Sequence, residues 1–449
     1  MNLSAHKEVM TAEVLSRRIA AVFRDHGFQA LLVGGCVRDL LLNRTPKDWD
    51  VATDATPSEI LRLFPDANLV GAQFGVVLVR DGEAQVEVAT FRSDGAYEDG
   101  RRPAGVRFEK SPREDAARRD FTINALFMDP VTGEILDFIG GREDLDSQII
   151  RAIGDAEARF REDHLRLLRA VRFAARLGFR IEPATFHAIQ RVAVEVRTVA
   201  PERVRDELTR ILTEGAASRG FELLDASGLL ERVLPEISAM KGVQQPPEYH
   251  PEGDVWVHTL LLLERLNHPT PTLAWGALLH DVGKPSTFQM ADRIRFNGHV
   301  EAGVEIAGHI MNRLRFSRED ADQILALIAN HMKFKDAFAM RESTLKRFIR
   351  QPGFEEHLEL HRLDCLASNG YTDSYEYVSA RAAGLSDEAL KPAPLLTGRD
   401  LIDRGYRPGP LFSEILRAVE DAQLEGTLHS AEEAWGLVEE RYPRTPSLQ

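Results

Sequence analysis

The stretch Leu31–Asp54, LLVGGCVRDLLLNRTPKDWDVATD, decides how the first part of the chain folds. Its apolar start ends in Gly34-Gly35, which is typical of a buried strand that opens into a tight turn. We expect a short helix over residues 37–42 and a second strand over Asp48–Val51. Because backbone N–H groups at a helix N-terminus behind glycine bind phosphate well, Gly35 is predicted to lie in a phosphate-binding turn.

Two acidic residues and one arginine of this stretch are candidates for binding a metal ion and a phosphate. Side chains alternate along a strand, so Asp48 and Asp50 are expected to share a face. Neighbouring carboxylates repel each other unless a cation lies between them, and Mg²⁺ prefers oxygen ligands. Arg38 adds a bidentate phosphate donor. The pattern favours a magnesium–nucleotide site, with two ions at the attacking and leaving oxygens, over a polar hairpin with two exposed acids.

The bulk composition limits the class of protein. The 449 residues are enough for about three domains, with 43% hydrophobic and 28% charged residues. A net charge of −14 argues against a surface that coats nucleic acid throughout, although a basic groove stays compatible with it. We find no leader-like or membrane-spanning apolar stretch, and Cys36 and Cys365 cannot build a disulfide framework or a zinc site. These features predict a cytoplasmic protein that does not bind membranes.

Two further strands are expected after a helix that starts at Pro57. Residues 75–79 and 85–91 alternate as strands do, and Asp81-Gly82 between them favours a hairpin turn. Glu87 is a candidate third carboxylate at the metals, and a surface acid is the alternative. Residues 93–108 are rich in Gly, Asp and Arg, which is typical of a mobile loop that gates an active site or simply covers the surface.

A second arginine-rich stretch, residues 159–178, is predicted to form one helix. Asp163, Arg166, Arg169 and Arg172 are spaced by three and lie on one side of it, which favours an anionic ligand over a balanced solvated surface. Cytosine and adenine both present an amino donor beside a ring-nitrogen acceptor. An accepting Asp163 and a donating Arg166 would match that edge and oppose uracil and guanine.

Several motifs together resemble the bacterial tRNA CCA-adding enzyme and poly(A) polymerase family. They are GG-x-VRD-x-LL followed by D-x-D, the loop segment DGRRP, RRDFTINA at residues 118–125, EDxxR at 162–166 and ERVRDEL at 202–208. The resemblance implies nucleotidyl transfer to the 3′ end of tRNA from CTP and ATP with Mg²⁺, and the DGRRP loop favours use of ATP. It implies the catalytic residues Asp48 and Asp50 and the nucleotide-binding residues Gly35, Arg38, Arg119, Asp163, Arg166, Arg169 and Arg172. A structural salt bridge is the alternative role of Arg119, and Arg203 is a weaker candidate for substrate contact.

A different chemistry is indicated beyond His250. The adjacent pair His280-Asp281 is accompanied by further imidazoles and one carboxylate on predicted helices, namely His258, His299, His331 and Asp364. Such ligands suit Mn, Co, Ni, Zn or Fe better than Mg alone, and metals held this way generate hydroxide. Single histidines on apolar faces are usually core residues. Asp364 is the least secure of the ligands, and His309 is a competing candidate.

The spacing of these ligands resembles the HD phosphohydrolase superfamily. The resemblance implies a metal-binding HD site and leaves open whether it turns over 2′,3′-cyclic phosphodiesters, 2′-nucleotides or other phosphoesters. LTGxDLI and PGP at residues 396–410 resemble C-terminal segments of the same enzyme family, which implies a tRNA contact there.

We therefore expect an α+β protein, with a small mixed-sheet nucleotidyltransferase head followed by mainly α-helical domains. The expected ranges are a head at 1–150, a base-recognition neck at 151–245, an HD domain at 246–370 and a helical tail at 371–449. Three rival functions remain at this stage. They are an A-only tRNA nucleotidyltransferase, a poly(A) polymerase, and a nucleotide-sensing HD hydrolase whose head only binds its ligand.

Overall fold

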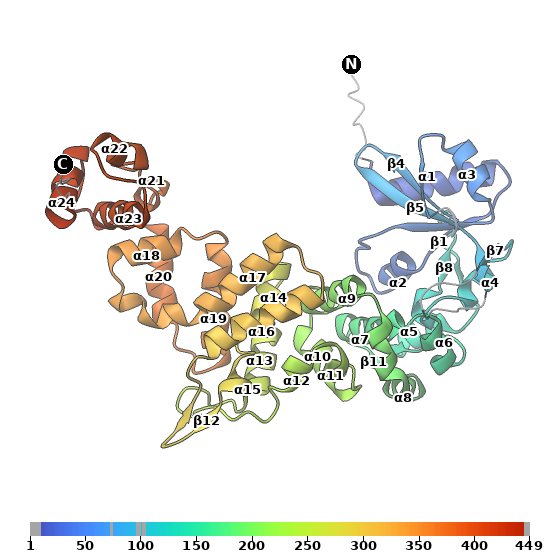
Figure 1. Cartoon of the computed structure of the whole chain (residues 1–449). Coiled ribbons are helices and arrows are strands. Elements are labelled where there is room, and N and C mark those ends of the chain that lie inside the picture. The colour runs from blue at the N-terminus through green and yellow to red at the C-terminus, as the bar shows by residue number, and fades with distance from the viewer. Residues whose placement is uncertain (1–9, 72–74, 96–99, 101–104, 444–449) are drawn as a thin grey trace, which may run out of the picture. The chain divides into compact units, whose positions relative to one another are not determined.

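The computed structural model describes residues 10–71, 75–95, 100 and 105–443. Its contacts divide the chain into two compact units, residues 1–238 and 239–449, which are described separately (Figure 1). Half of the loop expected at residues 93–108, namely 96–99 and 101–104, lies outside the described residues.

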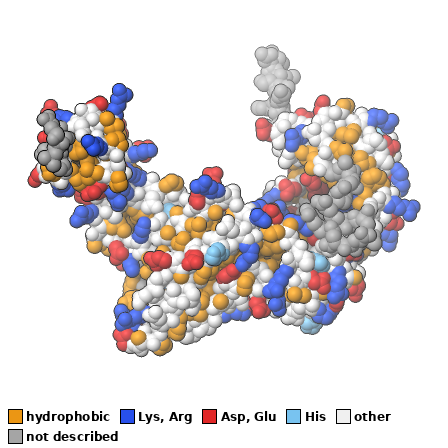
Figure 2. All heavy atoms as spheres, in the orientation of Figure 1, with side chains coloured by type: hydrophobic (Ala, Val, Ile, Leu, Met, Phe, Trp, Pro, Cys, Tyr) orange, Lys and Arg blue, Asp and Glu red, His pale blue; other side chains and the backbone are white. Residues whose placement is uncertain are grey.

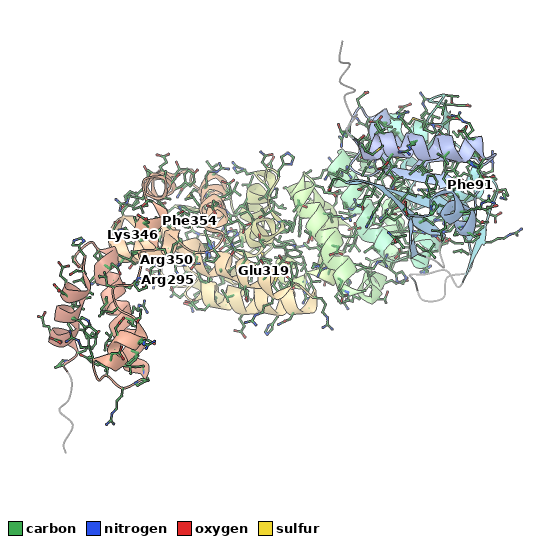
Figure 3. The ribbon with its side chains drawn as sticks, turned by 90° about the horizontal axis from the view of Figure 1, so that it is seen from above. Phe91, Arg295, Glu319, Lys346, Arg350 and Phe354 are labelled. Carbon is green, nitrogen blue, oxygen red and sulfur yellow. The ribbon has the colours of Figure 1, made fainter. Side chains whose placement is uncertain are left out.

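The first unit contains a seven-stranded mixed sheet in the order β3-β4-β5-β2-β1-β8-β9. Its strands are β1 (Ala30–Val33), β2 (Asp50–Thr53), β3 (Asn68–Gly71), β4 (Val76–Asp81), β5 (Ala84–Thr90), β8 (Phe127–Met128) and β9 (Ile135–Leu136). Only β2 and β5 pair in parallel, and every other neighbouring pair is antiparallel. Phe91, which is labelled in Figure 3, follows β5 and is fully buried. Its ring packs edge-on against Phe127. The fold class predicted from the sequence is confirmed.

The local expectations for the sheet region are mostly confirmed. Strands β4 and β5 form the predicted hairpin, with Asp81 paired to Ala84. Helix α3 (Pro57–Leu63) begins after Thr56, which forms a capping box with Glu59. Helices α1 (Ala12–Asp25) and α2 (Gly35–Leu41) pack against the sheet. A small second ladder joins β6 (Arg92–Asp94) to β7 (Val106–Phe108), before α4 (Pro112–Ala117).

The strand expected over Asp48–Val51 is shifted toward the C-terminus. Strand β2 begins only at Asp50, because its pairing with β5 starts at Asp50 and its pairing with β1 starts at Val51. Asp48 therefore lies in the connection that enters the strand, and Trp49 between the two acids is buried.

The single helix expected over residues 159–178 is wrong. The structure has two helices, α6 (Ala156–Glu162) and α7 (Leu165–Leu177), separated at Asp163, whose backbone is extended (φ −143°, ψ 105°). At the break, the Asp163 carboxylate accepts a hydrogen bond from Leu165 N at 3.1 Å, which satisfies a backbone donor at the start of α7. Helix α7 ends at Gly178, which has φ +76°.

The rest of the first unit consists mainly of helices around α7. The remaining elements are η2 (Thr122–Asn124), α5 (Gly141–Asp146), β10 (Ile149–Ile150), β11 (Arg180–Ile181), α8 (Pro183–Val192), η3 (Ala193–Thr198), α9 (Pro201–Thr213), α10 (Ala217–Ala226), α11 (Leu230–Val233) and α12 (Pro235–Ser238). Helix α7 contacts both α9 and α10, so it is the buried centre of this helical part.

In the second unit, the strands among the described residues form one hairpin, β12 (Gln289–Met290) with β13 (Ile294–Arg295), and the other elements are helices. Its first helices are α13 (Val255–Glu264), α14 (Pro271–Leu279), α15 (Lys284–Thr287), α16 (His299–Arg313), α17 (Arg318–Asn330), η4 (His331–Ala339) and α19 (Phe354–Ala367). The remaining helices are α18 (Glu342–Ile349), α20 (Asp373–Ala383), α21 (Asp387–Leu390), α22 (Gly398–Asp403), α23 (Pro410–Leu424) and α24 (Ala431–Arg441).

The last helices of this unit have their own apolar cluster around Leu401, Ile415 and Val438. They are joined to α18 by polar contacts, in which Lys346 donates to Leu424 O at 2.8 Å and Arg350 pairs with Glu420 at 2.7 Å (Figure 3). Basic and acidic side chains are interspersed over the visible face of each unit (Figure 2). Among the described residues, no helix combines the length and apolar character needed to cross a bilayer.

Candidate functional site

A cavity of about 650 Å³ in the first unit brings together the acidic residues of the head. Asp48, Asp50 and Glu87 line it, and Arg169 and Arg210 of the helical part line it too. Asp50 and Glu87 are direct neighbours on the parallel strands β2 and β5. The pairing of β2 with β5 therefore places Glu87 beside Asp50. The alternation of side chains along one strand could not show which strand would be its neighbour.

The carboxylates of this cavity repel one another. The pKa of Asp50 is raised from 3.8 to about 6, because the carboxyl group is buried and because Glu87 and Asp48 repel its charge, while Arg119 acts in the opposite direction. A divalent cation would relieve this repulsion, so the donor set fits a hard metal ion bound by oxygen.

The glycine turn lies next to Arg119. Gly34 has φ +78°, a conformation that favours glycine, and a Cβ built there would be 3.1 Å from Arg119 Nη1. Asp115 holds Arg119 through two hydrogen bonds, of 3.2 Å and 3.0 Å, and the arginine side chain keeps 19% of its surface exposed. Because its Nη1 also donates to Asn124 O at 3.4 Å, Arg119 is a fixed cation beside the turn that stays partly exposed.

Arg38 lies deeper than the sequence pattern suggests. It is only 2% exposed, and its guanidinium donates to Asp39 at 2.8 Å and to Asn124 at 2.6 Å. A Cβ on Gly35 would still be 3.7 Å from Arg38 Nη2, so the guanidinium backs the predicted phosphate turn from inside. A direct phosphate contact by Arg38 stays a prediction.

The side chains of Asp163 and Arg166 are held by partners on different elements, and the backbone N–H of Arg166 donates to Asp163 O at 3.0 Å. Asp163 accepts from both Nη atoms of Arg203 on α9, at 3.2 Å and 2.9 Å. Arg166 donates to Glu162 at 2.5 Å and to the Arg159 carbonyl at 3.0 Å. The predicted base-reading pair is therefore supported from two sides. Arg203, which the sequence marked only weakly in ERVRDEL, holds the Asp163 carboxylate.

The next two arginines of α7 differ in exposure. Arg169 pairs with Asp120 at 2.7 Å, retains 32% side-chain exposure and lines the acidic cavity. The pKa of Asp120 is lowered despite its burial, with Arg169 the main opposing charge. Arg172 is only 3% exposed and donates to Glu207 at 2.6 Å, which joins α7 to α9. These partners come from remote segments, so the face that appeared unbalanced in sequence is neutralised in the fold.

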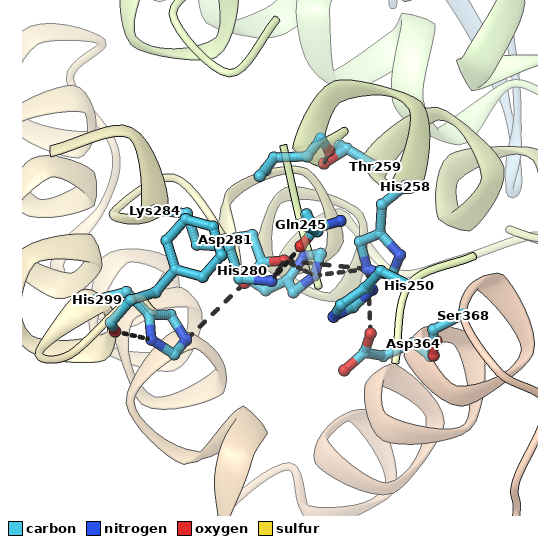
Figure 4. Close-up of polar contacts among 12 residues, drawn as sticks. Gln245, His250, His258, Thr259, His280, Asp281, Lys284, His299, Asp364 and Ser368 are labelled. Atoms are coloured by element: carbon cyan, nitrogen blue, oxygen red, sulfur yellow. Dashed lines mark hydrogen bonds and ion pairs between the residues drawn. The ribbon is translucent and has the colours of Figure 1, made fainter. Parts of the chain in front are cut away.

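The second unit brings all six predicted HD ligands into one cluster, and Figure 4 labels His258, His280, Asp281, His299 and Asp364. His258 Nε2 lies 3.3 Å from His280 Nε2 and 3.1 Å from Asp364 Oδ1. His280 Nε2 lies 3.2 Å from Asp281 Oδ2. Asp281 Oδ1 is 3.9 Å from His299 Nε2 and 3.8 Å from His331 Nε2. The competing candidate His309 lies exposed on α16 and takes no part in the cluster.

The inner nitrogens of this cluster fit metal ligation. The Nε2 atoms of His299 and His331 are buried and have no hydrogen-bond partner among the described residues. Burial lowers the pKa of His331 to about 4, so its imidazole is neutral and able to ligate. The pKa of His258 is instead raised to about 9, because hydrogen bonds to Asp364 and Glu252 outweigh the effect of burial.

A cavity of about 1010 Å³ opens onto the HD cluster. Asp281, His299, His331 and Asp364 form part of its lining, together with basic side chains of the same unit. These basic residues are Lys284, Arg293, Arg295 and Lys335. Lys284 was not singled out from the sequence, although it follows His280-Asp281 by three residues, and its Nζ lies 2.6 Å from Asp281 Oδ2. The cavity suits an anionic ligand beside a metal.

Three family models match this chain. They are the poly A polymerase head domain at residues 30–151, the probable RNA and SrmB-binding site of polymerase A at 178–241, and the HD domain at 254–360. The first contains Asp48, Asp50 and Arg119, whereas Asp163 and Arg172 lie between the first two models.

Curated relatives with the same description cover nearly the whole chain. A CCA-adding enzyme of Streptococcus pneumoniae serotype 19F (strain G54) is 31% identical over 413 residues, which is 92% of this chain and 93% of the relative. A CCA-adding enzyme of Geobacillus stearothermophilus is 47% identical over 207 residues, covering 46% of this chain and 51% of the relative.

Solved structures agree with these relatives. The Bacillus stearothermophilus CCA-adding enzyme in complex with CTP matches with a TM-score of 0.74 and 28% identity, over 96% of this chain and 98% of that one. The Thermotoga maritima CCA-adding enzyme complexed with tRNA shares the fold, with a TM-score of 0.56 and 21% identity over 94% of each chain. With its head motifs, its acidic cavity and these full-length similarities, the chain belongs to the CCA-adding enzyme family of nucleotidyltransferases.

Proposed function

We propose that this protein adds the 3′-terminal CCA to tRNA, without a nucleic-acid template, from CTP and ATP. The 3′-hydroxyl of the shortened tRNA attacks the α-phosphorus of the nucleotide, the bond to the β-phosphate oxygen breaks, and pyrophosphate leaves. The observation that carries the proposal is the one cavity lined by Asp48, Asp50, Glu87 and Arg169. It combines acids for a metal with a cation for a triphosphate.

Asp48 and Asp50 are the proposed Mg²⁺ ligands, with Glu87 as a third carboxylate. The raised pKa of Asp50 supports this assignment, since the three acids crowd together where a divalent ion would neutralise them. When bound, Mg²⁺ supplies charge stabilisation for the transferring phosphoryl group. Asp50 and Glu87 would hold the ion from the paired inner strands β2 and β5 of the sheet.

Arginines provide the proposed anion contacts. Arg119 and Arg169 are partly exposed and bind the triphosphate or ribose, beside the backbone of Gly35. Arg38 and Arg172 complete the predicted set, and their burial supports a contribution made chiefly by holding α2 and α7 in place.

Asp163 and Arg166 are the proposed readers of the base. Asp163 accepts from the amino group shared by cytosine and adenine, and Arg166 donates to the ring nitrogen beside it. A well-placed bidentate pair provides roughly 1–3 kcal/mol of discrimination. The ion pairs with Arg203 and Glu162 support this proposal because they restrict how each side chain turns.

A second activity is proposed for the HD cluster. His258, His280, Asp281, His299, His331 and Asp364 would hold one or two ions of Mn, Co, Ni, Zn or Fe. The unpartnered nitrogens of His299 and His331 support the fit. Such an ion supplies a hydroxide-generating Lewis acid, and Lys284, Arg293 and Lys335 in the adjoining cavity would bind the phosphoester.

The proposed domains are a head at 1–150, a base-recognition neck at 151–245, an HD domain at 246–370 and a tail at 371–449 that contacts tRNA. We propose a cytoplasmic location, because tRNA and nucleoside triphosphates are the substrates and because Cys36 and Cys365 are free thiols.

The transfer reaction is tested with purified protein and tRNA truncated before CCA, given CTP alone, ATP alone, and both. Addition of C-C and then A supports the proposal. Addition of A only to tRNA that already ends in CC would identify an A-only enzyme, and long A tails on unrelated RNA would identify a poly(A) polymerase. Nucleotide-dependent function that survives Asp50→Asn would indicate a sensor.

Two variants separate the sites. Asp163→Ala is expected to retain transfer but accept U and G, and intact selection of C and A would contradict the base-reading assignment. Hydrolysis of a 2′,3′-cyclic nucleotide should be lost in His280→Ala and retained in Asp50→Asn. Equal hydrolysis by the His280 variant and the unmodified protein would eliminate the HD proposal.

A further inference from the structure

His258 differs from the other histidines of the HD cluster in the hydrogen-bond partner of its Nδ1 atom, the ring nitrogen that faces away from the cluster. The Nδ1 atoms of His280, His299 and His331 lie 2.8, 2.9 and 2.7 Å from the backbone carbonyl oxygens of Ala277, Phe296 and Ile328. The Nδ1 atom of His258 instead lies 2.7 Å from a carboxylate oxygen, Glu252 Oε1. This difference sets His258 apart chemically, because a charged carboxylate accepts a stronger hydrogen bond from Nδ1–H than an amide carbonyl does.

Glu252 is built into the fold around this contact. Its side chain is only 7% exposed, and the same Oε1 atom also accepts from His250 Nδ1 at 2.8 Å. The two imidazoles meet edge-on, with ring centroids 4.9 Å apart, and both are labelled in Figure 4. Glu252 Oε2 is buried and has no hydrogen-bond partner among the described residues. The carboxylate is therefore committed to the two histidines through one oxygen.

The segment that carries Glu252 is anchored on its C-terminal side. Asp254 caps helix α13 by accepting from Val257 N at 2.8 Å, and its second oxygen accepts from Gly242 N at 2.7 Å. His258 then lies one turn into α13 and is fully buried. Both partners of the Glu252–His258 contact are thus held in place by neighbouring structure.

We propose that Glu252 is a positioning residue of the HD metal site, which fixes the Nδ1–H tautomer of His258 and strengthens its Nε2 as a ligand. The proposal rests on the proposed metal-binding function of this cluster and assigns Glu252 a role that the ligand motif does not contain. An N–H bonded to a carboxylate leaves the lone pair on Nε2, which lies beside Asp364 and His280. Loss of such an outer partner typically costs 10- to 100-fold in metal affinity.

The test measures metal binding on the full chain after chelator treatment. Co²⁺ is titrated into the unmodified protein, Glu252→Gln and Glu264→Gln, and binding is followed by calorimetry and by the visible absorption of the bound ion. Glu264 is the matched control, since it is an exposed glutamate on the same helix as His258. We expect 10- to 100-fold weaker binding and an altered Co²⁺ spectrum for Glu252→Gln only.

The possible failures are distinguishable. If the unmodified protein binds Co²⁺ tightly and Glu252→Gln binds it equally with the same spectrum, the role of Glu252 is refuted while the metal site stands. Equal losses in both glutamate variants would also refute it, since a general charge effect would then explain the result. If the unmodified protein binds no metal at the cluster, the HD proposal and this inference both fail. Thermal unfolding of the metal-free variants shows whether Glu252→Gln has lost its fold, and in that case Glu252→Asp must restore metal binding for the inference to hold.

Discussion

The carboxylate of Asp163 is held by both terminal nitrogens of Arg203, at 3.2 Å and 2.9 Å, across a sequence separation of 40 residues. Asp163 ends α6 in an extended conformation, so its side chain is not fixed by helix geometry. The orientation of the proposed base-reading acid therefore depends on α9.

We expect Arg203→Lys to relax the choice of nucleotide, because a lysine replaces a planar fork with a single point charge. The preference for CTP over UTP should fall about tenfold, within the roughly 1–3 kcal/mol that a bidentate contact provides. Competition between labelled CTP and UTP on truncated tRNA measures it. Arg205→Lys on the same helix is the control, since Arg205 pairs with Asp206. An unchanged preference in Arg203→Lys would remove Arg203 from base selection.

We expect Asp50→Asn to stabilise the metal-free protein while it abolishes transfer. The folded-state pKa of Asp50 is about 6 against an ordinary value of 3.8, so stability falls as the pH rises from 3.8 to 6 and stays reduced above that. Neutralising the group should recover up to about 3 kcal/mol at pH 7. Thermal unfolding without Mg²⁺ measures this effect.

Asp48→Asn provides the comparison for that experiment. Asp48 is exposed, so its variant should lose transfer with little change in stability. Added Mg²⁺ should raise the unfolding temperature of the unmodified protein and leave that of Asp50→Asn almost unchanged. A destabilised Asp50→Asn protein would show that the carboxylate is not under repulsion.

We expect Gly34→Ala to impair transfer more than stability alone explains. Gly34 has φ +78°, and the added Cβ would lie 3.1 Å from Arg119 Nη1 and displace it. Backbone strain of this kind costs about 1–3 kcal/mol. Gly82→Ala is the control, since Gly82 also has positive φ (+61°) but has open space around its Cβ. Steady-state kinetics should show a higher KM for CTP in Gly34→Ala alone, and similar kinetics in both variants would contradict a special role for this turn.

We expect Co²⁺ affinity at the HD cluster to rise with pH up to about 9. His258 has its pKa raised to about 9, so below that pH a proton competes with the metal for its Nε2 atom. His331, with a pKa of about 4, is already neutral and adds no such dependence near pH 7. Calorimetry at pH 7 in buffers of different ionisation enthalpy should detect proton release on binding. Binding without proton release would show that His258 is neutral before the metal enters.

The local elements were predictable from the sequence because their causes are local. The Gly34-Gly35 turn, the Asp81-Gly82 hairpin and the Thr56 cap all depend on residues within a few positions of each other. The candidate HD ligands could also be named from the sequence, since five of them lie in or next to helices and Asp281 directly follows His280 in the turn after α14.

Partners from distant segments were not predictable. The row Asp163–Arg172 appeared to be one cationic face, but Asp120, Glu207 and Arg203 come from other elements and pair with it. Periodicity along one helix contains no information about which charges a folded chain will bring against it. For the same reason Glu87 remained ambiguous until β5 was seen to pair in parallel with β2.

The sequence by itself determined the family, the mixed-sheet head with its helical continuation, and the types of residue available for each site, because turns, caps and motifs are encoded over short distances. Only the tertiary structure decided which side chains share a cavity and which arginines are buried in ion pairs. It also decided that the Nδ1 atom of His258 contacts a carboxylate. Those outcomes depend on pairing between remote segments, where burial and charge act through space.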